Sequence, residues 1–393
     1  LTMNIVIIPA FFQTKSRKTL GSFFLEQARA LQQKGHKVTI LYCDTYSIKC
    51  VKDWFAYNEE KFEIIEGIQI YRNRCFCPMK HGIEGHRKAF ANGIQKLYDQ
   101  YMKGNKPDII HAHCCVWAGY AAMKLSGQIG VPYVVTEHAT LFQLHRDEIS
   151  AGNNAIIQQV YQKAARVICV SRAFARLIES YRTDIDVVGN VVNCDIFTPP
   201  KVSKNHNEIR FLTVCYMEEE AQLYKKGMDI LIQSWTEIVK ENTNVKLVIG
   251  GGGKAVQKVV DWTKEYHVTD SVEFLGTLNR EQVVEQMQMC DCFVLPSRYE
   301  TFGVVYIEAM ACGKPVIAVA NGGPDDFVKD FNGMLIKPDV EELTGTINKM
   351  IKRLKIYDYY HEEEISGYIK NLFSYDSIAG KLLEVYKSIL TSY

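Results

Sequence analysis

The sequence predicts an α/β protein that contains two Rossmann-like, doubly wound parallel sheets. Its 393 residues are enough for two domains of ordinary size. Hydrophobic residues make up 47% of the chain and charged residues 23%, which is typical of a soluble globular protein. Short apolar runs alternate with helical patterns along the whole chain, and this alternation is typical of parallel α/β folds.

The same succession of elements is predicted twice. In the first half, a strand at 4–10 leads through a loop to a helix at 22–34 and then to a strand at 37–42. In the second half, the corresponding elements are a strand at 209–216, a helix at 228–240 and a strand at 245–250. Further strands are predicted at 108–112, 133–136, 166–170, 271–274, 291–295 and 315–319. We therefore expect an N-terminal domain at 1–198, a polar linker at 199–208 and a C-terminal domain at 209–372.

Composition and charge argue against several other classes of protein. The net charge of +1 gives no bulk attraction to nucleic acid, so we expect no nucleic-acid partner. No apolar run approaches the roughly 20 residues that a membrane span requires, and the N-terminus enters a strand pattern without the features of a signal peptide. The 12 cysteines lack C-x-x-C spacing, and several lie in apolar strands, which is typical of reduced thiols in a cytoplasmic protein.

The segment PSRYETFGVVYIEAMACGKPVIA at 296–318 carries the most chemical information. The apolar run before it predicts a buried parallel strand, a loop follows, and Gly303 opens a helix. A helix that begins where a parallel strand ends directs free N–H groups and its positive dipole end toward the ligand crevice. Glu300 on the loop and Glu308 in the helix would repel an anion, so we expect them to bind neutral hydroxyls such as those of a sugar and a ribose.

The spacing of Glu300 and Glu308, together with the flanks PSRYETFG and EAMACGKPVIA, resembles the E-x7-E signature of retaining glycosyltransferases of the GT-B fold, family 4 in particular. The resemblance covers nearly the whole chain. It implies two Rossmann-like domains that face an interdomain cleft, with a C-terminal helix at 373–393 that packs back toward the N-terminal domain. It also implies transfer of a sugar from a nucleotide-diphosphate sugar, most commonly UDP-linked, to a hydroxyl acceptor, without a cofactor or a metal.

The resemblance also implies roles for individual residues. Glu308 would hold the ribose and Glu300 the hydroxyls of the donor sugar. Main-chain N–H groups around Thr301, Phe302, Gly303 and Val304 would bind the phosphates. The loop Gly276-Thr277-Leu278 matches the one that contacts the nucleotide base, so Gly276 and Leu278 are predicted donor-binding residues.

The segment KGMDILI at 226–232 resembles the family motif K-G-x-D-x-L-I. By that resemblance Lys226, at the start of a helix, stabilises the departing diphosphate; the alternative is an ordinary solvated helix end. Just upstream, Tyr216 stands where the family usually carries an arginine on the same diphosphate. Lys225 and Arg298 are the candidates for this second cation.

Two motifs of the N-terminal half resemble the same family. His138 follows the strand at 133–136 and matches the histidine at the floor of the acceptor cleft, although a lone histidine there is by default a structural residue. Gly21 opens the segment GSFFLEQARAL, and the resemblance implies that its backbone approaches the donor phosphate. The alternative for Gly21 is ordinary turn chemistry before an amphipathic helix.

Two further features invite a ligand. His111, His113 and Cys114 lie near a strand end, but no second cluster with metal-ligand spacing exists, so we expect no metal site. Residues 72–106 carry eight Lys and Arg against two acidic residues. This stretch is either a solvated helical face or a patch that makes peripheral contact with the anionic inner face of the cell membrane, where a lipid-linked or glycan acceptor would lie.

Other functions remain open on the sequence alone. A nucleotide-sugar binding protein with little turnover fits the missing arginine, and an epimerase or phosphorylase can use the same fold. A glycoside hydrolase would leave Lys226 without a role. The glycines at 250–253 are not followed by the acidic residue that a dinucleotide site requires, which argues against an oxidoreductase. We therefore predict a glycosyltransferase of cell-surface or lipid-linked glycan synthesis.

Overall fold

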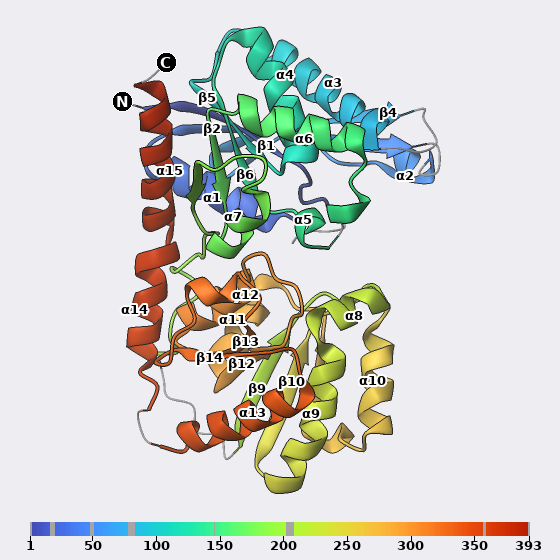
Figure 1. Cartoon of the computed structure of the whole chain (residues 1–393), viewed down its shortest axis with the longest axis vertical. Coiled ribbons are helices and arrows are strands. Elements are labelled where there is room, and N and C mark those ends of the chain that lie inside the picture. The colour runs from blue at the N-terminus through green and yellow to red at the C-terminus, as the bar shows by residue number, and fades with distance from the viewer. Residues whose placement is uncertain are drawn as a thin grey trace. The chain divides into compact units, whose positions relative to one another are not determined.

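The computed structural model describes residues 2–15, 20–47, 51–77, 83–144, 146–201, 208–356 and 359–391. The chain forms two compact units, each of which is a sheet with helices on both faces (Figure 1). Unit 1 contains Leu1–Val191 together with Tyr375–Tyr393, and unit 2 contains Val192–Ser374. The segment 199–208, which the sequence predicts as a linker, falls within unit 2, and its residues 202–207 lie outside the described residues.

Unit 1 has an eight-stranded sheet in the order β3-β4-β2-β1-β5-β6-β7-β8, in which only the β3–β4 pair is antiparallel. Its strands are β1 (Asn4–Pro9), β2 (Lys37–Ser47), β3 (Phe62–Ile65), β4 (Ile68–Cys77), β5 (Ile109–His113), β6 (Tyr133–Glu137), β7 (Arg166–Cys169) and β8 (Ile185–Val187). Its main helices are α1 (Ser22–Gln33), α2 (Val51–Ala56), α3 (Ile83–Tyr101), α4 (Tyr120–Ile129), α5 (Leu141–Leu144), α6 (Ala151–Lys163), α7 (Arg172–Ile178) and α15 (Tyr375–Leu390), with the π-helix η2 (Cys115–Gly119) and the 3-10 helix η3 (Arg146–Glu148). Helix α15 packs against α1, whereas α3, α4 and α6 pack against one another.

Unit 2 has a six-stranded, fully parallel sheet in the order β11-β10-β9-β12-β13-β14. Its strands are β9 (Ile209–Val214), β10 (Val245–Gly250), β11 (Val272–Gly276), β12 (Cys292–Leu295), β13 (Val316–Val319) and β14 (Gly333–Ile336). Its helices are α8 (Glu220–Lys226), α9 (Met228–Glu241), α10 (Val256–Glu265), α11 (Arg280–Met289), α12 (Val304–Ala311), α13 (Val340–Leu354) and α14 (Glu362–Phe373), with the 3-10 helices η4 (Thr269–Ser271) and η5 (Pro324–Asp326).

The two sheets reverse their strand order at equivalent places. In unit 1 the first strand, β1, lies between β2 and β5, and in unit 2 the first strand, β9, lies between β10 and β12. In doubly wound sheets, ligands bind beyond the carboxyl ends of the strands at this switch point. Candidate binding residues are therefore those that follow β1 and β5 in unit 1 and β9 and β12 in unit 2.

Burial explains why the central strands of the two sheets were predictable, whereas the far end of β2 and the edge strand β3 were not. Strand β12 is buried along its whole length, as expected of a parallel strand covered on both faces. The prediction of a strand at 37–42 was too short, because β2 continues to Ser47 in register with β4. Strand β3 at the sheet edge alternates between exposed and half-buried residues, and its pattern was not recognised. Among the described residues, no helix is long and apolar enough to cross a membrane.

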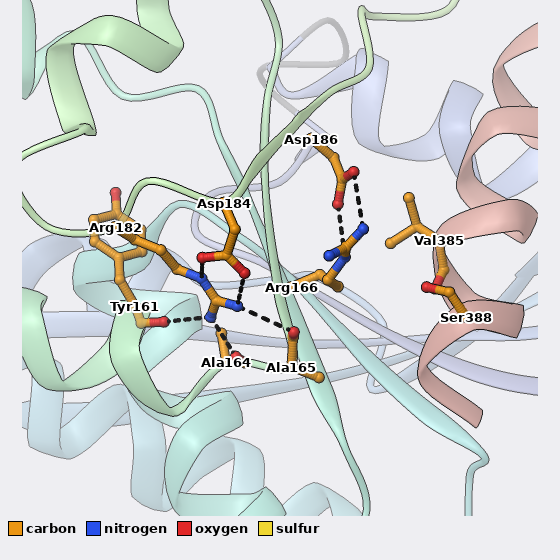
Figure 2. A network of polar contacts seen from close by, with 9 residues as sticks. All are labelled: Tyr161, Ala164, Ala165, Arg166, Arg182, Asp184, Asp186, Val385 and Ser388. Carbon is orange, nitrogen blue, oxygen red and sulfur yellow. Dashed lines mark hydrogen bonds and ion pairs between the residues drawn. The ribbon is translucent and has the colours of Figure 1, made fainter. Parts of the chain in front are cut away.

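Arg182 joins the segment that precedes β8 to the C-terminal end of α6 (Figure 2). Its guanidinium donates to the carbonyl oxygens of Tyr161, Ala164 and Ala165, which lie at the C-terminal end of α6. Helix ends leave such carbonyls without intrahelical partners. Two further bonds of 2.7 Å join Arg182 to the Asp184 carboxylate, and the pKa of that carboxyl is lowered by these hydrogen bonds.

A second ion pair lies next to this network. Arg166 of β7 pairs with Asp186 of β8 at 3.0 Å. Figure 2 shows Arg166 on the side of Val385 and Ser388 of α15. The outermost strand of the sheet, β8, is thus held by an ion pair as well as by its backbone bonds to β7. These contacts stabilise the fold of unit 1.

Candidate active site

The loops that follow β9 and β12 meet at the switch point of unit 2. There the Lys226 ammonium and the Glu300 carboxylate form an ion pair with an Nζ–Oε2 distance of 2.8 Å. The two side chains keep only 25% and 14% of their surface exposed. The structure therefore brings together two residues that are 74 positions apart and that the sequence predicted separately.

The position of Lys226 corrects the sequence prediction. Lys226 is the last residue of α8, not the first of the helix that follows. The Gln222 side chain caps the start of α8, because it accepts the backbone N–H groups of Glu218 and Glu219. Gly227 ends this helix with a φ of 69°. A Cβ atom at Gly227 would lie 2.0 Å from the Pro296 carbonyl oxygen, so only glycine lets the two loops approach this closely.

The charge state of Lys226 depends on its partner. Burial lowers the pKa of this amine, but the attraction and hydrogen bond of the Glu300 carboxylate outweigh it and raise the pKa above its usual value. Lys226 is therefore a permanent cation at neutral pH. The neighbouring Lys225 has a lowered pKa because of burial and the Lys226 charge, and its amine makes no hydrogen bond or ion pair with the part of the chain that the structure describes.

Arg298, one of the two candidates for the second cation, is already paired with a carboxylate. Its guanidinium forms a two-pronged bond of 2.7 and 2.8 Å with the Asp229 carboxylate and donates to the Tyr224 carbonyl. Such paired bonds are strong and directional. Tyr216 is 57% exposed and offers only a phenol. Of the two candidates that the sequence raised, Lys225 is the one whose cation has no such partner among the described residues.

Gly303 turns the chain from the loop into α12. Its φ of 95° is in the left-handed region, and α12 begins at Val304. The Tyr306 N–H donates to the Gly303 carbonyl, whereas the N–H groups that precede it in the first turn have no acceptor within the helix. The ring of Phe302 packs against Phe327 and Phe373 in the core. Thus Phe302 can bind a phosphate only through its main chain. Thr301 lies half-buried just ahead of this turn.

Glu308 is buried on the same helix and faces a residue that the sequence analysis missed. The Arg280 guanidinium lies 3.5 Å from the Glu308 carboxylate, and the same guanidinium stacks over the Phe197 ring at 5.0 Å. Arg280 is the first residue of α11 and follows Leu278 by two residues, so its position just after the predicted base-contacting loop was the available signal. Nothing in the sequence pattern, however, indicates that it turns toward Glu308.

The glycine-rich turn after β10 supports the base-contacting loop. Gly276 ends β11 with a φ of 67° and is exposed. A Cβ atom at Gly250 would lie 2.7 Å from Leu278 Cδ1, so the Leu278 side chain rests directly on that glycine. The Gly251 N–H also donates to the Gly276 carbonyl at 2.8 Å. Two of the predicted donor-binding residues therefore stand on a rigid backbone support.

In unit 1 the loop after β1 lies beside His138. Gly21 has a φ of 67°, and a Cβ atom there would lie 2.9 Å from the Phe24 ring and 3.0 Å from the Phe11 carbonyl oxygen. The first turn of α1 is thereby held close to the loop. The rings of Phe23 and Phe24, which lie in this first turn, contact the imidazole of His138 at centroid distances of 5.0 and 5.4 Å. Gly21 and His138, predicted separately, are thus connected through one aromatic pair.

Behind His138 lies a buried row of histidines. His138 Nε2 is 3.0 Å from His113 Nδ1. The His113 ring stacks on His111 at 4.3 Å, and His111 bonds the hydroxyls of Thr136 and of Tyr386 on α15. Burial lowers the pKa of His111 and of His138 to about 3, and His111 adds to the effect on His138. The pKa of His113 is lowered well below its usual value by burial and by the two neighbouring histidines.

Glu137 holds the opposite side of the same strand end. Its carboxylate is fully buried and accepts hydrogen bonds from the backbone N–H groups of Cys115, His138 and Ala139 and from the Tyr161 hydroxyl. These bonds satisfy a charge that would otherwise be costly to bury. Glu137 therefore fixes the backbone that carries His138. The sequence analysis missed this role, although a glutamate next to the predicted histidine was a visible signal.

The basic stretch 72–106 does not form one exposed face. Arg72 is buried against Glu63, and Arg87 is buried as well. Residues 78–82 lie outside the described residues. Within the described ranges, no group of three metal-ligating side chains is present.

Comparison with known protein families assigns the chain. The family described as Glycosyltransferase Family 4 matches residues 20–196, and the one described as Glycosyl transferases group 1 matches residues 204–365. A glycosyltransferase of Methanocaldococcus jannaschii is 30% identical over 258 residues, which cover 64% of this chain and 68% of the relative. The chain belongs to glycosyltransferase family 4. It is therefore a glycosyltransferase of the hexosyltransferase type.

Two further relatives of this glycosyltransferase have named activities. The D-inositol 3-phosphate glycosyltransferase of Mycolicibacterium smegmatis is 31% identical over 295 residues, covering 67% of this chain and 64% of the relative. The gpi3 subunit of the Schizosaccharomyces pombe phosphatidylinositol N-acetylglucosaminyltransferase is 26% identical over 295 residues, covering 72% of this chain and 61% of the relative. These names describe the relatives.

Solved structures show the same fold at low sequence identity. The sucrose-phosphate synthase of Thermosynechococcus elongatus is 18% identical and superposes with a TM-score of 0.79, covering 99% of this chain and all of the other. The Anabaena protein HepE, solved in complex with UDP and glucose, is also 18% identical and has a TM-score of 0.70, covering 98% and 100%. The predicted fold class, GT-B with two Rossmann-like parallel-sheet domains, is confirmed.

Proposed function

We propose that this glycosyltransferase moves a hexose from a nucleotide-diphosphate sugar to a hydroxyl acceptor with retention of anomeric configuration and without a metal. The observation that carries the proposal is the ion pair between Lys226 and Glu300 at the switch point of unit 2. A permanent cation, a carboxylate and the N-terminal end of α12 lie together there. This combination suits a ligand that has both anionic phosphates and neutral hydroxyls.

In the proposed reaction, the phosphates take up the free first-turn N–H groups of α12, and Lys226 turns from Glu300 to the diphosphate. Glu300 then accepts hydrogen bonds from the hydroxyls of the donor sugar. The bond between the anomeric carbon and the phosphate oxygen breaks, and the acceptor oxygen attaches on the same face. The acceptor proton passes to the departing diphosphate, which therefore needs no separate general acid. Lys226 and α12 stabilise the charge that develops, which is electrostatic rather than acid–base catalysis.

Glu308 and Arg280 define the nucleoside end of the proposed donor site. Glu308 would accept from the ribose hydroxyls, and the Arg280 guanidinium beside it would hold the carboxylate in place. The main chain at Gly276 and Leu278 would contact the base. The HepE structure with UDP and glucose supports UDP as the first nucleotide to test.

The acceptor is proposed from the relatives. Two of them are named for inositol-containing acceptors, one of which is a lipid. We propose an acceptor hydroxyl on a lipid-linked or cell-surface glycan precursor, which unit 1 binds near His138, whereas Gly21 stays a proposed contact of the donor phosphate. The exposed lysines of the segment 83–106 would contact the anionic lipid surface at the inner face of the membrane.

A panel of UDP-, GDP- and ADP-sugars, incubated with and without EDTA, tests the proposal by release of the free nucleotide. We expect slow, EDTA-resistant release from one donor, with loss of that release in Glu300→Ala. Release that requires a divalent cation would overturn the metal-independent mechanism. Neither release nor nucleotide binding would overturn the donor site as a whole.

A second candidate is a nucleotide-sugar binding protein with little turnover. Tyr216 in place of an arginine and the engagement of Arg298 by Asp229 favour it, because one expected diphosphate cation is absent. Calorimetry with UDP distinguishes the two functions. Tight binding of UDP, with no turnover of any donor in the presence of candidate acceptors, would support the binding protein.

A further inference from the structure

One fully buried nitrogen in the histidine row of unit 1 has no hydrogen-bond partner among the residues that the structure describes. His113 is 1% exposed, and its Nε2 makes no hydrogen bond within the part of the chain that the structure describes. Its other ring nitrogen, Nδ1, lies 3.0 Å from His138 Nε2. A neutral imidazole carries one N–H, so one of the two rings donates in this bond and the other accepts.

The unpartnered nitrogen decides the direction of this bond. If His113 carried its proton on Nε2, a buried N–H group would have no acceptor, and such orphaned donors are rare in native proteins. With the proton on Nδ1, His113 donates to His138 and leaves only a lone pair unsatisfied. A buried acceptor without a partner is the less costly of the two. His138 then accepts at Nε2 and must carry its own proton on Nδ1.

The remaining nitrogen of His138 is the one that can meet a ligand. His138 Nδ1 makes no hydrogen bond to any residue that the structure describes. The ring retains 9% exposure and is held by Phe23 and Phe24 of α1. Its orientation is therefore restricted by aromatic packing on one side and by His113 on the other.

His113 is itself held in place from several sides. It lies between the ring of His111 and the ring of Phe24, at centroid distances of 4.3 and 4.8 Å. Residues 111 and 113 alternate with residue 112 along β5 and so share one face of the sheet. His111 is anchored at both ring nitrogens, to the Tyr386 hydroxyl and to the Thr136 hydroxyl. The C-terminal helix thus contributes to the support of the row.

We infer that His113 is a positioning residue that fixes His138 in the tautomer with its proton on Nδ1, so that His138 presents a hydrogen-bond donor to an oxygen of the bound acceptor. His138 then orients a sugar hydroxyl or ring oxygen and does not remove a proton through that nitrogen. The inference deepens the proposed function and rests on it for the identity of the ligand. The tautomer itself follows from the geometry of the row and does not require turnover.

The decisive measurement is the protonation of His138 in the unliganded wild-type protein. Nitrogen-15 spectra of histidine-labelled protein, recorded near pH 7.5, report which ring nitrogen carries the proton, and His138→Gln assigns the signal. We expect His138 protonated at Nδ1 and His113 also at Nδ1. A proton on Nε2 of His138 would overturn the inference whatever the activity of the protein.

Two substitutions then test the positioning role. In His113→Asn the amide nitrogen is attached to Cγ, as Nδ1 is, so it can still donate to His138. In His113→Gln the amide lies one bond further out, where Nε2 stood, and the bond to His138 is lost. In the glutamine variant we expect His138 to lose its single tautomer and kcat to fall at least about tenfold, the effect of losing one hydrogen bond, with little change in the donor KM. In the asparagine variant we expect the tautomer to be kept and kcat to stay within about threefold of the wild-type value.

The outcome separates this inference from the proposed function. If no donor is turned over, the wild-type spectrum still establishes or overturns the tautomer. If turnover occurs, but the asparagine and glutamine variants are equally impaired at equal thermal stability, the role of His113 is packing alone, and the inference is wrong. Melting temperatures of both variants supply the control for folding.

Discussion

Units 1 and 2 share one order of central strands but carry different chemistry at the ends of those strands. In unit 2, side chains of opposite charge pair around the switch point, as in Lys226 with Glu300 and Arg298 with Asp229. In unit 1, the side chains that contact His138 are neutral imidazoles and aromatic rings, and burial lowers the pKa of His138 to about 3. The Glu137 carboxylate beside them is fully buried and already accepts hydrogen bonds from three backbone N–H groups and the Tyr161 hydroxyl. One fold therefore supports an ionic site and an uncharged site within the same chain.

The difference indicates what each unit can bind. Paired ions can exchange partners with a charged ligand at modest cost, because the ligand replaces a charge that was already balanced. A row of neutral, buried imidazoles offers hydrogen bonds of fixed direction and no net charge. We therefore assign the anionic nucleotide diphosphate to unit 2 and the acceptor hydroxyl to unit 1. Four predictions test the features of the two units that this division uses.

The largest effect is expected from removal of the central cation of unit 2. Lys226→Ala should lower kcat for the preferred donor by about 100- to 1,000-fold, the typical loss of one group that stabilises developing charge. The measurement is the rate of nucleotide release at saturating donor. Lys254→Ala is the matched control, since that lysine lies in the same unit and is largely exposed, and equal losses in both variants would contradict the role of Lys226.

The close approach of the two loops gives the next effect. Gly227→Ala should destabilise unit 2 by about 2–4 kcal/mol, because the new Cβ would collide with the Pro296 carbonyl and the left-handed backbone disfavours alanine. Denaturant unfolding measures the change. Gly345→Ala, at a position of α13 with no atom near the new Cβ, should be neutral or stabilising by up to about 1 kcal/mol.

The two units should respond to opposite ends of the pH scale. His111 and His138 have folded pKa values of about 3, below their usual 6.5, so the unfolded chain binds protons more readily. The contribution of these two histidines to the free energy of unfolding of unit 1 should then be fully present above pH 6.5. It should decrease as the pH drops below 6.5, by about 2 kcal/mol for each histidine at pH 5.

Lys226 behaves in the opposite sense. Its folded pKa lies above the usual 10.5, so its contribution to unit 2 is complete below pH 10.5 and is lost as the pH rises through the folded value. Hydrogen exchange read by mass spectrometry follows the two units separately in one sample. Loss of protection in both units together between pH 6.5 and 5 would contradict the division.

The smallest effect concerns the nucleoside end of the ionic site. Arg280→Ala should raise the donor KM about fivefold, with kcat little changed, because a partly exposed ion pair contributes only about 1 kcal/mol. Arg280→Lys should recover part of the loss, since a cation is retained. Steady-state kinetics with the preferred donor measures both variants, and a fall in kcat alone would remove Arg280 from the ribose site.

The sequence by itself determined the architecture and the linear motifs. Parallel strands are buried on both faces and appear as apolar runs, so both doubly wound sheets were predictable. The link between Glu300, Gly303 and Glu308 was also predictable, because all three lie on one strand–loop–helix segment. Within such a segment, local geometry alone fixes which groups reach the end of the sheet.

Only the tertiary structure decided which distant residues meet. The ion pair of Lys226 with Glu300, the capture of Arg298 by Asp229 and the contact of His113 with His138 join residues on different strand–loop segments. Their distances depend on how neighbouring loops pack, and no periodicity along the chain encodes that. The physical reason is that secondary structure follows from local backbone preferences, whereas the charge and tautomer of a side chain follow from the groups that burial places around it.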